Sequence, residues 1–151
     1  MLLESQVCSL ELSKKLLTLG VNRSSLFFHT SGGVISRLEA LPILDSNYSA
    51  FTVAELLNML PGRITLQNDE PMNSFLLSLQ KSFFIEDMDK PEGMRLTEIY
   101  IANYVCDAID LNSIFPPLRL FPHNYSDPNA ANALARILIE IIENKFIEIK
   151  K

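Results

Sequence analysis

Apolar residues recur every three or four positions in three stretches of the chain, and this spacing predicts three helices. The first helix follows Ser9, whose side chain can cap the free backbone N–H groups of the first turn. Leu12, Leu16 and Leu19 lie on one face of this helix. Gly20 ends it, because glycine readily adopts the left-handed backbone of a helix C-terminus.

The second helix has the sharpest start signal in the chain. Thr52 can accept a hydrogen bond from the N–H of Glu55, and the Glu55 side chain can reach back to the N–H of Thr52. Phe51 and Leu56 stand at the two positions of a hydrophobic staple. Leu60-Pro61-Gly62 ends the helix, because proline disfavours helical backbone at the residue before it.

The third helix is predicted to begin at Asp127-Pro128, a capping residue followed by proline at the first helical position. Asn144 is the expected C-cap, and Phe146 and Ile147 are expected to dock the tail. Two faces of the helix are distinguished by periodicity. The core face contains Ala131, Leu134, Ala135, Leu138, Ile141 and Ile142, and the solvent face contains Asn132, Arg136, Glu140 and Glu143.

Runs rich in β-branched and aromatic residues predict about five strands. Two short strands, 25–30 and 34–38, flank Ser31-Gly32-Gly33, whose glycines suit a tight hairpin turn. A third short strand is predicted over residues 63–66. The longest two, 74–86 and 94–107, are expected to pair antiparallel. The order of elements predicts a single α+β domain over residues 1–151, with three helices and a largely antiparallel sheet.

Prolines interrupt the apolar stretch 111–125, which is therefore predicted to lack regular structure and to wrap the surface. Aromatic and aliphatic side chains on proline-stiffened backbone are typical of interface anchors. The candidate interface consists of Phe115, Leu118, Phe121 and Tyr125. The alternative interpretation is that these side chains cap the core.

Composition narrows the class of protein. The chain has 151 residues, 48% of them hydrophobic and 21% charged, which is ordinary for one globular domain. A net charge of −5 opposes a general affinity for nucleic acid, which needs clustered Lys and Arg. No apolar run is long enough to span a membrane, and Glu4 stands where a secretory signal would carry basic charge. A cytoplasmic protein with no membrane partner is expected.

Candidate chemistry is sparse. A nucleophilic site could be formed by a cysteine, a histidine and an aspartate. The candidates are Cys8, Cys106, His29, His123, Asp107 and Asp110. None of them lies in a known local sequence signature. Structural interpretations are favoured, with Cys106 as a buried thiol, His29 facing outward from its strand and His123 in a loop. The acidic turn 86–92 lacks the glycine and final glutamate of a calcium-binding loop. No metal or cofactor is predicted.

Three segments in this order carry a resemblance to a known family. They are CSLELSKKL, continuing to Gly20, YSAFTVAEL, continuing to Leu60-Pro61, and DPNAANA, continuing to Glu143-Asn144. In combination they resemble a family of small uncharacterised bacterial proteins often found in phage, prophage or other mobile-element contexts. The resemblance implies a setting for the protein and supplies no activity or site residue.

The first functional hypothesis is a non-catalytic accessory protein of phage or mobile-element origin that binds another protein or itself. The alternative is a small enzyme with a site around Cys106, Asp107 and the two histidines. A third interpretation, nucleic-acid binding, would require the few Lys and Arg residues to gather on one face.

Overall fold

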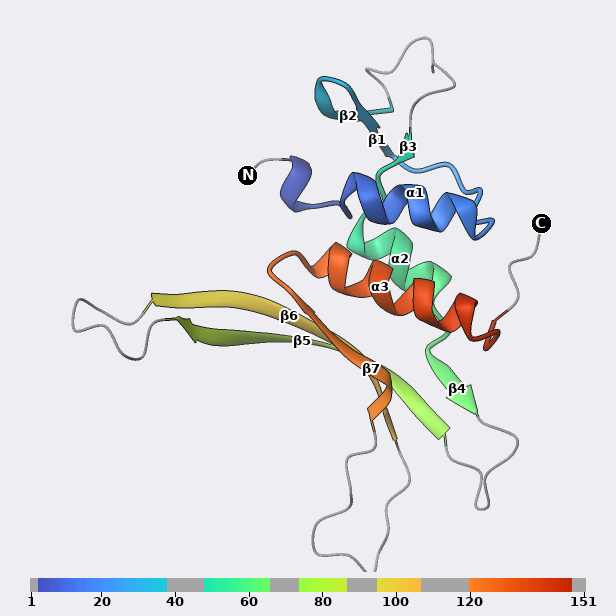
Figure 1. The fold of residues 1–151 in the computed structure, drawn as a ribbon, viewed down its shortest axis with the longest axis vertical. Coiled ribbons are helices and arrows are strands. Elements are labelled where there is room, and N and C mark those ends of the chain that lie inside the picture. The colour runs from blue at the N-terminus through green and yellow to red at the C-terminus, as the bar shows by residue number, and fades with distance from the viewer. Residues whose placement is uncertain (1–2, 38–47, 66–73, 87–94, 107–119, 148–151) are drawn as a thin grey trace, which may run out of the picture.

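The computed structural model describes residues 3–37, 48–65, 74–86, 95–106 and 120–147. These residues form an α+β fold with three α-helices, as predicted. After a short 3-10 turn (Leu3–Ser5), the helices are α1 (Leu10–Thr18), α2 (Val53–Met59) and α3 (Ala130–Glu143). They pack together, and α3 lies between the other two helices and a long sheet (Figure 1).

Two antiparallel sheets contain the strands. The small sheet has the order β2-β1-β3 and the larger sheet the order β4-β5-β6-β7. These seven strands exceed the expected five because β3 and β7 were not predicted from the sequence. Their bounds are β1 (Phe27–Thr30), β2 (Gly33–Ser36), β3 (Tyr48–Ser49), β4 (Arg63–Thr65), β5 (Ser74–Glu86), β6 (Arg95–Cys106) and β7 (Leu120–Asp127).

The prediction that 111–125 lacks regular structure is wrong for its last part, which forms β7 along β6. Pro122 is accommodated because β7 is an edge strand, and because the pairing shifts between Ala102 and Tyr104 opposite this proline. Edge strands and bulges are the places where a sheet tolerates a residue without an N–H. Residues 111–119 lie outside the described residues.

The caps of α1 form as the sequence predicts. The Ser9 side chain accepts a hydrogen bond from the N–H of Leu12. Gly20 has φ of +90°, a left-handed conformation that favours glycine. This turn lets the N–H of Val21 donate to the carbonyl of Leu16 at 3.0 Å, which satisfies a carbonyl at the helix end.

The predicted capping box of α2 is also confirmed. Thr52 Oγ1 accepts from the N–H of Glu55 at 3.2 Å, and Glu55 Oε2 accepts from the N–H of Thr52 at 2.7 Å. Both staple residues, Phe51 and Leu56, are buried. Glu55 Oε1 additionally accepts from the N–H of Leu26 at 2.9 Å. The cap therefore also fixes the chain that enters β1.

The start of α3 differs from the prediction by two residues. Asn129 is the N-cap, with Oδ1 accepting from the N–H of Ala131 at 2.8 Å. Asp127 instead accepts from the N–H of Asn129 at 2.8 Å in the turn before the helix. The Asp127 side chain thus pairs within the turn and Asn129 takes the capping position, so the helix begins after Pro128. Asn144 is the C-cap, as predicted.

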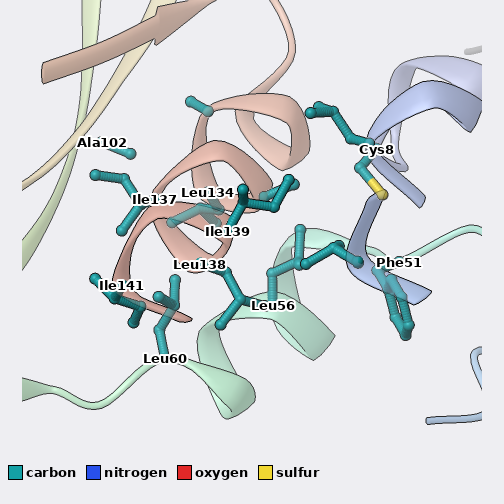
Figure 2. Packing of buried hydrophobic residues seen from close by; sticks show 14 of the residues in the cluster. Cys8, Phe51, Leu56, Leu60, Ala102, Leu134, Ile137, Leu138, Ile139 and Ile141 are labelled. Carbon is teal, nitrogen blue, oxygen red and sulfur yellow. The ribbon is translucent and has the colours of Figure 1, made fainter. Parts of the chain in front are cut away.

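Glu140, predicted to face solvent, is only 8% exposed. The reason is the position of α3, which contacts β6 and β7 on one side and α1 and α2 on the other. More than one face of the helix is therefore covered. The main core surrounds α3 (Figure 2), and Phe146 and Ile147 pack against it as predicted. The labelled core residues are Cys8, Phe51, Leu56, Leu60, Ala102, Leu134, Ile137, Leu138, Ile139 and Ile141.

Thr52→Ala is expected to lower the free energy of unfolding by about 0.5–2 kcal/mol, because the N–H of Glu55 loses its partner. Chemical denaturation monitored by circular dichroism measures this change. Thr52→Ser is the matched control, since it keeps the capping oxygen and should retain most of the stability. Equal losses in the two variants would show that the cap is not the source of the effect.

Candidate interaction surface

The four predicted interface residues have different positions relative to the described structure. Phe115 and Leu118 lie outside the described residues. Phe121 pairs with Tyr104 across β7 and β6, and its side chain is outside the described part of the chain. Tyr125 is half-buried and packs against the main core. Burial, together with the neighbouring Glu140, raises the pKa of the Tyr125 hydroxyl to about 12. Tyr125 is therefore the one member whose side chain has a described position.

The described cysteine and its nearest histidine do not form a nucleophile and base pair. Cys8 Sγ lies 3.3 Å from Ser13 Oγ, and burial raises the pKa of this thiol. His29 Nε2 donates to the backbone carbonyl of Cys8 at 2.9 Å, so the ring contacts the main chain rather than the sulfur. Burial lowers the pKa of His29, which favours the neutral ring. Asp107, Asp110 and the side chain of Cys106 lie outside the described residues.

His123 lies in β7, so its predicted place in a loop is wrong. Its Nδ1 is 2.5 Å from Glu140 Oε1 on α3. The ring is exposed while the carboxylate is mostly buried. The contact links the edge strand β7 to α3. Sequence reasoning missed it because the partners are 17 positions apart and no local spacing connects them.

A cavity of about 460 Å³ opens between the N-terminal segment, the β1–β2 hairpin and the start of α3. Two asparagines in its wall already hydrogen-bond to the main chain. Asn129 Nδ2 donates to the carbonyl of Val7 at 2.8 Å, and Asn132 Oδ1 accepts from the N–H of Ser9 at 2.8 Å. The described residues contain no group of three or more His, Cys, Asp or Glu that could hold a metal ion.

A more distinctive feature is a long two-stranded extension of the larger sheet. β5 and β6 pair continuously from Phe75–Cys106 to Glu86–Arg95. β4 accompanies β5 only over the first few residues, and β7 accompanies β6 only from Tyr100 onward. Within the described structure, 78–86 and 95–99 therefore have no other strand beside them. We call these two segments the ribbon; in Figure 1 it extends away from the helices.

The ribbon presents apolar surface to solvent. Phe83 is 58% exposed. Lys81 and Glu98 form an ion pair across the two strands at 2.8 Å, and this pairing raises the pKa of the lysine. Two-stranded hairpins are marginally stable in water by themselves and gain stability when further chain packs on them. The ribbon thus has the exposed apolar side chain and the open strand edges of a segment that can pair with another chain.

Sequence reasoning predicted both strands of the ribbon but not its role. The available signal was length: β5 has 13 residues and β6 has 12, about twice the usual strand length of five or six residues. Strands of that length extend past short neighbours. The part of β5 and β6 that has no neighbouring strand depends on where β4 and β7 end. Those ends follow from tertiary contacts, which the spacing of residues does not reveal.

Comparison with known proteins gave no match to a family profile, a curated sequence or a solved structure. Among the described residues, every helix is too short or too polar to cross a membrane.

Proposed function

We propose that this protein is a non-catalytic accessory protein that binds another protein chain, and that the ribbon is its binding element. The observation that carries the proposal is the projecting pair of strands with no further strand beside 78–86 or 95–99 in the described structure. The exposed Phe83 adds an apolar anchor next to this open backbone.

An open strand edge binds protein through general chemistry. Its unpaired N–H and C=O groups form a template for an additional strand, and side-chain contacts beside the new strand supply specificity. Aromatic anchors account for a large share of the energy at protein interfaces. The ribbon therefore combines backbone hydrogen bonding, through its open edge, with apolar contact, through Phe83.

The alternative of a small enzyme placed its site around Cys106, Asp107 and the histidines; Asp107 and the side chain of Cys106 lie outside the described residues, while Cys8 and both histidines lie within them. The Cys8 thiol is buried against Ser13, and His29 is engaged by a backbone carbonyl. His123 holds Glu140 at the edge of the sheet. The phage or mobile-element setting is part of the same proposal and is based on the sequence resemblance; the genes that neighbour this one would test it.

Site-specific photo-crosslinking in the native cells tests the proposal. Benzoylphenylalanine is placed at Phe83 and, as the control, at Leu26, an apolar residue of similar exposure near β1 (62% against 58%). Discrete protein adducts are expected from position 83 and not from position 26. Equal or absent adducts at the two positions would overturn the proposal, and mass spectrometry identifies the captured chain.

A further inference from the structure

We infer that the chain which completes the β5 edge is a second copy of this protein, paired antiparallel with the first through residues 78–86. The inference rests on the proposed function and names the partner. It depends on the direction of the backbone groups, the absence of proline and glycine from the strand, and the self-complementarity of its sequence.

The direction of the backbone groups follows from the contact with β4. The N–H of Leu77 donates to the carbonyl of Gly62 at 3.0 Å, so the backbone groups of residue 77 point toward the β4 side of β5. In an antiparallel strand these groups alternate between the two sides. Residues 79, 81, 83 and 85 therefore turn their N–H and C=O groups toward the open side, while even-numbered residues face β6.

The outer edge of β7 and the open edge of β5 beyond β4 differ in their protection against pairing. β7 contains Pro122 and lies opposite an irregularity in the register of β6, two devices that discourage the addition of a strand. Residues 78–86 contain neither proline nor glycine. Lys81 is the one charged residue in 78–85, and Glu98 neutralises it within the same ribbon. The edge of β5 at residues 78–86 can thus accept a further strand.

The sequence of the edge is compatible with its own copy. A two-fold axis at Ser82 brings all of 78–86 into register and places Leu79 opposite Ile85, and Lys81 opposite Phe83. No like charges face each other, whereas an axis at Lys81 would oppose two lysines. The pairs at 79, 81, 83 and 85 are the ones whose backbone groups point outward, so this register forms hydrogen bonds.

Charge does not oppose a second copy at this place. The ribbon carries Lys81 and Arg95 against Glu86 and Glu98, so it is neutral, although the whole chain has a net charge of −5. Antiparallel pairing puts the two helical bodies at opposite ends of the shared strands. Each paired edge has nine residues, roughly 30 Å in length, which keeps those bodies apart.

Disulfide trapping tests the register. In the proposed dimer, residue 82 faces its own copy as a non-hydrogen-bonded pair with a Cα separation of about 4.5 Å, within the range for a disulfide. Ser82→Cys should therefore form a disulfide-linked dimer under mild oxidation. Thr97→Cys on β6 is the matched control, because three strand spacings, roughly 14 Å, already separate its two copies across the strands, and the register displaces them along the strands as well. Equal yields from the two variants and the wild type would overturn the inference.

Sedimentation equilibrium tests the association without a crosslink. The wild type should form a discrete dimer, and Lys81→Pro should weaken it about tenfold or more because proline removes an outward N–H. Lys81→Ala also loses the ion pair with Glu98 but keeps that N–H, so it should retain the dimer. Circular dichroism verifies the fold of both variants.

The two proposals fail in different ways. A wild type that stays monomeric at its highest soluble concentration, or a dimer that Lys81→Pro leaves unchanged, overturns pairing with a second copy. If position 83 still captures a different protein, the proposed function stands with a foreign partner. If position 83 captures nothing, the proposed function fails as well.

Discussion

Leu56→Ala is expected to lower the free energy of unfolding by about 2–5 kcal/mol, because the substitution leaves a cavity in the main core. Leu56 is fully buried on α2 and belongs to the cluster that surrounds α3. It also stands at the staple position opposite Phe51, so its loss loosens the start of the helix. Urea denaturation followed by circular dichroism measures the change.

Leu57→Ala is the matched control for this experiment. The same substitution at the next residue of the same helix removes a side chain that is 39% exposed. The expected loss is below about 1 kcal/mol, since little buried surface is removed and alanine favours helix. Similar losses at 56 and 57 would contradict the assignment of the buried face of α2.

Asn129→Ala is expected to cost about 2–4 kcal/mol, because one side chain makes two kinds of contact. Asn129 Oδ1 caps α3 at the N–H of Ala131, and Nδ2 donates to the carbonyl of Val7. Val7 is buried, so its carbonyl would lose a partner in a place with little access to water. The substitution thus weakens both the helix start and the attachment of the N-terminal segment.

Asn129→Ser separates these two contributions. Serine is a good N-cap but cannot reach the carbonyl of Val7, so this variant should lose about half as much stability as Asn129→Ala. Thermal denaturation of the three proteins gives the comparison. If Ser and Ala destabilise equally, the cap contributes nothing. If Ser behaves as wild type, the contact with Val7 contributes nothing.

Local signals predicted much of the fold because they act over a few residues. Thr52 and Glu55 are three positions apart and form the predicted cap. Gly20 ends α1 through its own backbone conformation. The long alternating runs of β5 and β6 identified two strands that pair antiparallel, as expected. In each case the physical cause lies within the segment itself.

The features that sequence reasoning missed depend on distant partners. β7 contains Pro122 and has the local composition of a loop, yet the edge of β6 recruits it as a strand. Glu140 follows the polar periodicity of a surface residue, but α3 is covered on more than one side and His123 approaches the carboxylate. The open edge of the ribbon likewise results from how far the neighbouring strands extend.

The central position of α3 has a consequence for the order of folding. It is the last of the described helices, yet it provides the surface against which α1, α2 and β6 pack. During synthesis the apolar faces of those earlier elements remain without their common partner until residues 130–143 have left the ribosome. Contacts between distant parts of a sequence slow folding. Chaperones that shield apolar nascent segments should therefore engage this chain until α3 emerges.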